Sequence, residues 1–307
     1  METEDEVTDV VAAEHDSEVY DQVVAVGIDD SPQALAAARY AVRAADFRGL
    51  DLLMVHAYEL PPLDVPMEQA ILDACDQSAR KLMVDVAAQL VIPSRMQVET
   101  VVQPDSPVVL LDRISRTVPL LVVGQDHLGW GERLRLGAVA GHVGQKAQCP
   151  VVVVPGGWRA PRTSESHPVV VALDDDTPAD AVLRFAFQEA EFLHTGVVVL
   201  HASPYRHSEQ SGVAAEEASL TEQVAGWKED HPDVSVQVMV VSGDADANLV
   251  KWSRFAAVLV LGRRKRHGWS HWTHAVLRAV VKQTRSPLIV VPEIYDQTRH
   301  EHTPAIT

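Results

Sequence analysis

A glycine-punctuated segment, VVGQDHLGWGERLRLGAVAGHV (residues 122–143), has the residue types of a phosphate-binding loop. A β-branched run ends at Gly124, a loop follows, and a helical pattern opens at Gly137. Successive backbone N–H groups in such a loop form a nest for anions, and the following helix N-terminus adds partial positive charge. Glycine lets the main chain approach a phosphate and adopt positive φ. The outline predicts a nucleotide loop, although His127 and Ala138 stand where a second glycine and a hydroxyl are usual.

Basic side chains follow the corresponding glycine near the C-terminus, in the segment GRRKRHGW, which holds the run 263–266. The loop after Gly124 carries Arg133 and Arg135. Side-chain cations can replace lost backbone donors on a phosphate. We read the 263–266 run first as a solvated or intramolecular charge cluster, with an anion site and an acidic protein partner as the alternatives.

Neither metal chemistry nor covalent catalysis is predicted. His267, His271 and His274 have the spacing of one helix face, but no Cys or acid lies nearby to complete a zinc site. Cys149 precedes a proline at the start of an apolar strand pattern and is expected in the core. The sequence has no G-x-S-x-G and no G-x-x-x-x-G-K-[ST] motif. We therefore predict that the protein is not an enzyme, with no catalytic residues and no metal ligands.

The elements that must position these residues occur twice. The segment VVAVGIDDSPQALAAARYAVRAA matches VVVALDDDTPADAVLRFAFQEA, so that Asp29 falls on Asp174. The offset of 145 residues still holds at the next strand, where His56 falls on His201. The glycine loops and the last strands match at offsets of 138 and 137. One repeat unit therefore accounts for nearly the whole chain.

The repeat divides the chain into named parts. Copy one is residues 21–157 and copy two is residues 167–294, joined by a linker at 158–166. An acidic leader, residues 1–20, precedes them, and a tail, residues 295–307, follows. The leader holds eight acidic residues and no Lys or Arg, which is typical of a disordered solubilising segment.

Within each copy, continuous Val/Leu/Ile runs alternate with helical patterns, as in a parallel sheet covered on both faces. The fold class is α/β, with two tandem doubly wound domains that each hold a five-stranded parallel sheet flanked by helices. Ser31 and Pro32 are the expected N-cap and first residue of the first helix. Ligands in such sheets bind at the strands' carboxyl ends. For copy one we predict strands at 23–28, 51–58, 96–102, 119–124 and 150–155, and helices at 32–48, 67–90, 106–117 and 137–147.

The last strands, PVVVVP and PLIVVP, are apolar on both faces and lie at a sheet edge in this topology. An exposed hydrophobic edge invites pairing with another strand. We expect the two edges to pair within the chain as an internal pseudo-dimer, held by the linker's high effective concentration. A homodimer of whole chains stays open.

Charge and hydropathy limit the partners. The formal net charge of −17 argues against nucleic-acid or anionic-membrane binding, which needs a basic surface. No secretory signal pattern occurs, and no apolar run approaches the roughly 20 residues of a membrane span. We expect a cytoplasmic protein with no nucleic-acid or membrane partner.

These residues together resemble a tandem universal stress protein. The resemblance rests on the VGIDDS/VALDDD turn, the VHA/LHA second strand, and the glycine loop that leads to CPVVVVP or SPLIVVP. In ATP-binding members, the aspartate contacts the nucleoside, backbone after the histidine reads adenine, and a Gly-x2-Gly-x9-Gly-(Ser/Thr) loop holds the phosphates. The resemblance carries these roles to Asp29, Ala57, Gly124, His127, Gly137 and Ala138 in copy one, and to Asp174, Ala202, Gly262, Lys265 and Ala275 in copy two.

The departures from that pattern lower the expected affinity for ATP. Copy one loses the middle glycine to His127 and the hydroxyl to Ala138, and copy two keeps only Gly262. Two lost hydrogen bonds to charged groups would weaken binding by about a hundred- to ten-thousand-fold. Asp29 and Asp174 have two open readings, a ribose or Mg²⁺ contact and a turn cap. The histidines His56 and His201 are expected to bond locally.

We therefore predict a cytoplasmic stress-response regulatory or scaffold module with weak or absent ATP binding and no required cofactor. One alternative is a functional ATP-binding stress sensor that uses copy one, with Arg133 or Arg135 as substitute phosphate ligands. A second alternative is a slow nucleotide hydrolase.

Overall fold

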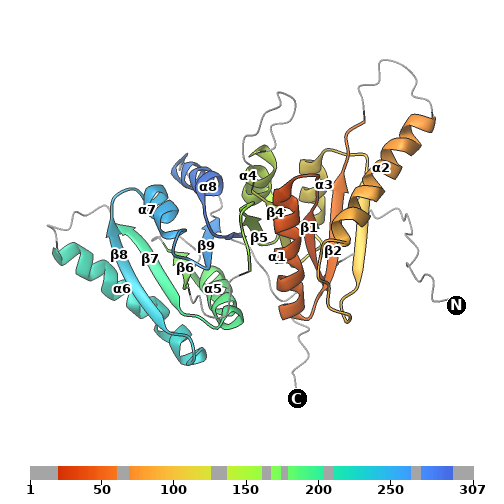
Figure 1. The fold of residues 1–307 in the computed structure, drawn as a ribbon. Helices are drawn as coiled ribbons and strands as arrows, with labels where there is room; N and C mark the ends of the chain where they lie inside the picture. Colours follow the sequence, from red (N-terminus) through yellow and green to blue (C-terminus); the bar gives the residue numbers. More distant parts are fainter. Residues whose placement is uncertain are drawn as a thin grey trace.

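Ten strands form one continuous sheet in the order β3-β2-β1-β4-β5-β10-β9-β6-β7-β8 (Figure 1). The computed structural model describes residues 20–60, 69–125, 137–160, 167–173, 179–203, 210–263 and 271–292. In copy one the elements are β1 Val23–Gly27, α1 Pro32–Arg48, β2 Asp51–Ala57, α2 Gln69–Ala87, β3 Val98–Gln103, α3 Pro107–Ile114, β4 Leu120–Gly124, α4 Gly137–Lys146 and β5 Val151–Val154. In copy two they are β6 Val169–Ala172, α5 Ala179–Leu193, β7 Val197–Ser203, α6 Gln210–Asp230, β8 Val236–Ser242, α7 Ala245–Trp252, β9 Val258–Arg263, α8 His271–Gln283 and β10 Leu288–Pro292.

The two halves of the sheet meet at β5 and β10. These strands pair antiparallel, whereas the strands within each copy pair parallel. At the centre of the junction Val152 lies opposite Ile289, and these two residues hold the same position in their copies. A pseudo-two-fold axis therefore passes through this pair. The sheet is one unit of ten strands rather than two separate sheets of five, because each last strand completes the other's edge.

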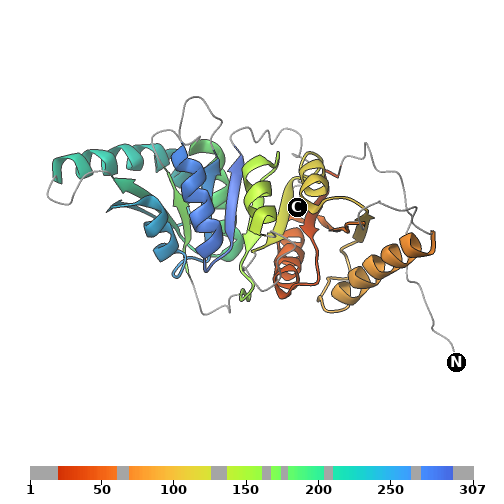
Figure 2. The same cartoon turned by 90° about the horizontal axis from the view of Figure 1, so that it is seen from above.

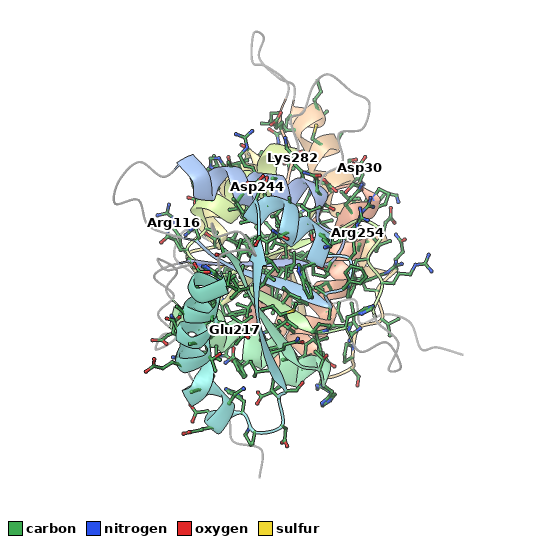
Figure 3. The ribbon with its side chains drawn as sticks, turned by 90° about the vertical axis from the view of Figure 1, so that its left-hand side faces the viewer. Asp30, Arg116, Glu217, Asp244, Arg254 and Lys282 are labelled. Carbon is green, nitrogen blue, oxygen red and sulfur yellow. The ribbon has the colours of Figure 1, made fainter. Side chains whose placement is uncertain are left out.

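Two apolar cores lie on the two faces of the sheet. Side chains of successive strand residues alternate between them: Val24 and Val26 of β1 face one core, while Val23 and Ala25 face the other. Helices α1, α2, α5 and α6 pack on the first face, and α3, α4, α7 and α8 pack on the second. Figure 2 shows α4 and α8 next to each other where the two copies meet, and Figure 3, seen from the copy-two end, shows α6 and α7 on opposite sides of the sheet.

Helix α1 begins and ends where its sequence predicts. The Ser31 hydroxyl accepts a hydrogen bond from the Ala34 N–H at 3.1 Å, and Pro32 is the first helical residue. At the other end Gly49 adopts φ of 64°, and the next N–H, of Leu50, donates to the Ala45 carbonyl at 2.9 Å. Between the caps, the alanine-rich inner face lies flat against β1 and β4.

The other predicted elements of copy one agree with the structure to within a few residues. Helix α2 ends at Ala87 rather than at residue 90, because the chain beyond it forms hydrogen bonds between residues three positions apart, as in a 3₁₀ turn. One of them joins the Leu90 N–H to the Ala87 carbonyl at 3.0 Å. The predicted start of this helix at residue 67 lies outside the described residues. Among the helices that the structure describes, none has the length and apolar character needed to cross a bilayer.

Candidate functional site

Three of the residues predicted to contact a nucleotide lie around one pocket in copy one. The pocket opens at the carboxyl ends of β1 and β4 and has a volume of about 80 Å³. Asp29, Ala57 and Gly124 line it, together with side chains from α1 and α3. Val139, in the first turn of α4, also lines the pocket. The site therefore stands where a doubly wound sheet is expected to hold a ligand.

Asp29 orders the start of α1. Its Oδ1 atom accepts a hydrogen bond from the Ser31 N–H at 3.0 Å and a second one from the Ser31 hydroxyl. The same hydroxyl accepts from the Ala34 N–H, so that Asp29 and Ser31 together cap the helix. The turn-cap reading of this aspartate is confirmed.

Gly124 has a packing role that does not involve a phosphate. A Cβ atom at this position would lie 2.8 Å from the carbonyl carbon of Gln33 and 3.0 Å from its Cβ. Only a residue without a side chain allows the first turn of α1 to lie this close to the end of β4. This close approach is sufficient by itself to require glycine.

The pocket lining is largely apolar, and its polar side chains are those of Asp29, Ser31 and Gln33. Asp29 is the sole ionisable residue among the described residues that line it. The remaining contacts come largely from aliphatic side chains: Val55, Leu110, Leu111, Val123 and Val139. Such a lining favours a flat, uncharged group and repels an anion.

The second-strand histidines hold strand ends together. The Nδ1 atom of His56 lies 2.8 Å from the Ile28 carbonyl oxygen, and Nδ1 of His201 lies 2.9 Å from the Leu173 carbonyl oxygen. Each bond ties the carboxyl end of the second strand to the residue after the first strand of the same copy. The local role predicted for both histidines is confirmed.

The predicted residues of copy two are only partly described. Ala202 lies opposite Val241 of β8, and Gly262 lies opposite Val291 of β10. Ala275 is exposed on α8. Asp174 and Lys265 lie outside the described residues, as does His127 in copy one. Gly137 and Ala138 are the first two residues of α4. The structure thus brings three predicted site residues together in copy one and leaves the phosphate loops outside its description.

Comparison with known proteins decides the family. A sequence model of the universal stress protein family matches residues 22–155 and again residues 165–292. The chain belongs to the universal stress protein family.

Relatives with the same two-domain length support this assignment. The chain is 32% identical over 287 residues to universal stress protein Rv2623 of Mycobacterium tuberculosis, with 88% of this chain and 96% of that protein covered. It is 28% identical over 284 residues to Rv2005c of the same species, with 87% and 96% covered. A crystal structure of a universal stress protein from Archaeoglobus fulgidus superimposes with a TM-score of 0.66 at 18% identity, covering 90% of this chain and 98% of that one.

Sequence reasoning missed one reciprocal contact between the two universal stress protein domains. The Gln125 side-chain amide donates to the Val281 carbonyl at 2.7 Å and to the Thr284 carbonyl at 3.4 Å. Arg263, at the equivalent position of copy two, donates to the Ala147 and Gly144 carbonyls at 2.6 and 3.5 Å. Both residues directly follow the strand glycine of their loop, which is the signal that an alignment of the two copies could have used.

This contact accounts for the first member of the basic run. Burial lowers the pKa of Arg263, whose guanidinium lies against the C-terminal end of α4 rather than in solvent. The intramolecular reading of the 263–266 run therefore holds for Arg263. Residues 264–266, with Arg133 and Arg135 of copy one, lie outside the described residues.

Proposed function

We propose that this universal stress protein is a cytoplasmic regulatory or scaffold module of the stress response, with weak or absent ATP binding and no catalytic activity. The observation that supports the proposal most directly is the lining of the copy-one pocket. Its one ionisable described residue is Asp29, a carboxylate whose Oδ1 already caps α1. Among the described residues of this lining, no cationic side chain is available to a triphosphate.

The loop sequence supports the same conclusion. A universal stress protein that binds ATP uses main-chain amides to hold the phosphates, and small residues keep those amides accessible. Here the middle glycine is His127 and the hydroxyl position is Ala138. Loss of two such hydrogen bonds moves a micromolar site to the millimolar range, through a factor of about a hundred to ten thousand. The presence of Gly124 is not evidence for phosphate binding, because its close packing against α1 already requires a glycine.

Equilibrium dialysis or calorimetry with ATP and the purified chain tests the proposal. We expect no binding below about millimolar ATP, and a tightening of about a hundred-fold or more in a chain with His127→Gly and Ala138→Ser. The matched control is Gly141→Ala in α4, where the added methyl group meets no described atom within 4 Å apart from its own helix backbone. Stoichiometric adenine nucleotide extracted from the protein as purified would overturn the proposal and favour an ATP-binding sensor.

Phosphate release addresses the remaining alternative. We expect no release from ATP above the rate without protein. Turnover that disappears in Asp29→Ala, while the fold is retained, would instead establish a slow nucleotide hydrolase that depends on the copy-one pocket.

A further inference from the structure

Helices α1 and α5 meet beside the junction of β5 and β10, on the same face of the sheet (Figure 1). Phe47 and Phe192 stack there with ring centroids 4.1 Å apart. The two residues are 145 positions apart, the offset that relates the first helix of one copy to that of the other. A residue that contacts its own equivalent lies on the pseudo-two-fold axis. This contact would therefore form in any pairing of two copies, whether of the same or of different kinds.

The neighbouring contact is not symmetric. Arg48, the last residue of α1, forms an ion pair with Glu189 of α5. The Glu189 side chain is 1% exposed and that of Arg48 is 19% exposed. The guanidinium also lies over the ring of Phe185, 5.7 Å from its centroid. Arg48 bonds the Oε1 atom, and among the described residues no hydrogen-bond partner is found for the Glu189 Oε2 atom. In the part of the chain that the structure describes, the cation that pairs with this buried carboxylate is supplied by the other copy.

The equivalent positions cannot repeat this ion pair. The 145-residue offset places Leu193 at the position of Arg48 and Ala44 at the position of Glu189. A symmetric interface makes each contact twice, once on either side of the axis. Here one side holds a charged pair and the other side holds two apolar residues. The interface between copy one and copy two therefore differs from an interface between two identical copies.

The difference is largest for copy two. If copy two paired with a second copy two, Glu189 would face Leu193 of its partner and lose its cation. A buried charge left without its partner shifts an equilibrium by about a hundred- to several-thousand-fold. In a pair of two copies one, Arg48 would face Ala44, and its partly exposed guanidinium could still reach water.

We propose that the Arg48–Glu189 ion pair makes this interface selective, so that the surface formed by α5 and β10 of copy two accepts copy one and rejects a second copy two. The apolar strands and the phenylalanine pair hold any two copies together, and the ion pair selects which two. Selectivity of this kind arises from a group that is left unsatisfied in the wrong complex.

Pairing without the covalent linker tests this selectivity. A protease site placed within residues 161–166 allows the folded chain to be nicked between its copies, unfolded in urea and refolded, and native mass spectrometry then distinguishes the pairs by mass. The wild-type halves should return as the mixed pair. The chain with Arg48→Leu and Glu189→Ala carries at these two positions the residue types of Leu193 and Ala44. Its halves should pair at random, with about a quarter of the pairs made of two copies one and about a quarter made of two copies two. The same distribution from both chains, mixed or random, would overturn the proposal.

A measurement on the intact chain decides the matter if the nicked halves do not refold. In urea unfolding, Arg48→Leu should raise the equilibrium constant for unfolding by a factor of about a hundred or more, and adding Glu189→Ala should reverse most of that increase. Arg95→Leu is the matched control. The Arg95 side chain is 70% exposed and pairs at 2.5 Å with Asp46 of α1, the helix that also holds Arg48. Equal stability of Arg48→Leu with and without Glu189→Ala would contradict the proposal.

Discussion

Gln125 and Arg263 stand at the same position in the two copies, and each donates hydrogen bonds to main-chain carbonyls at the end of the last helix of the other copy. The final carbonyls of a helix have no partner within it. In this protein the neutral amide of Gln125 donates to the carbonyls at the end of α8, and the guanidinium cation of Arg263 donates to those at the end of α4. The two halves are thus tied together on the face of the sheet opposite the Arg48–Glu189 ion pair.

Replacement of Arg263 should show how much its charge contributes. Because Arg263→Met removes a charged donor and leaves the carbonyls at the end of α4 without it, we expect a loss of about 1.5–3 kcal/mol in the free energy of unfolding. Arg263→Gln copies the donor that stands at this position in copy one, so it should lose less. Urea denaturation of the full chain measures both, and equal losses would show that the hydrogen-bond donor has no role.

Substitution of Gly124 tests the packing role of that glycine. Gly124→Ala places a methyl group 2.8 Å from the Gln33 carbonyl carbon, and we expect about 1–3 kcal/mol of destabilisation from the displaced backbone. Gly141→Ala is the control, because no described atom outside its own helix backbone lies within 4 Å of its Cβ position and alanine is the better helix former. It should be neutral or stabilising. Tolerance of alanine at residue 124, seen as an unchanged urea midpoint, would contradict the close approach of α1.

The two cysteines should react differently. Cys149 is buried, and burial raises the pKa of its thiol to about 12, so the folded protein should not label at this residue at pH 8. Cys75 is only partly buried and serves as the internal control. Labelling with a maleimide, followed by peptide mass spectrometry, should find Cys75 modified first and Cys149 modified only in urea. Equal rates for the two thiols in the folded chain would place Cys149 outside the core.

The raised pKa of Cys149 also predicts a pH dependence. An unfolded thiol titrates at about 8.5, so between that pH and about 12 the unfolded chain loses a proton that the folded chain keeps. Stability should therefore fall as the pH rises through this range, with a slope that approaches about 1.4 kcal/mol per pH unit. Cys149→Ala should reduce the slope. A smaller slope should remain, because burial, and secondarily the charge of Glu189, also raises the pKa of Tyr40.

Substitution of Asp29 distinguishes a structural role of this residue from a role in nucleotide binding. Asp29→Ala removes the acceptor for Ser31, and we expect a loss of about 0.5–2 kcal/mol of stability, as for other helix-cap substitutions. Ser31→Ala should lose a similar amount. Neither change should weaken the residual binding of ATP in a dialysis experiment, because the carboxylate does not favour an anion. A tenfold or larger loss of affinity in Asp29→Ala alone would assign this residue to the nucleotide instead.

Much of the fold was predictable because its causes are local. Ser31, Pro32 and Gly49 set the ends of α1 through caps that involve only nearby residues. The unbroken apolar runs of β1, β4 and β5 indicated strands covered on both faces, and the repeat at a constant offset indicated that the arrangement occurs twice. Part of the site was predictable in the same way: the acidic turn at Asp29 and the glycine at Gly124 lie at carboxyl ends of parallel strands, which meet at one edge of the sheet. The position of Ala57 in the site came from the resemblance to the family.

The sequence by itself determined the repeat, the α/β class, and the departures of the loop from the family's ATP-binding pattern. Only the tertiary structure decided why Gly124 is glycine, where Arg263 directs its charge, and that Arg48 of one copy meets Glu189 of the other. The physical reason is distance along the chain. Helix caps and strand patterns are encoded by residues a few positions apart, whereas these three contacts join residues separated by up to 141 positions and exist only after the helices have packed and the two copies have paired.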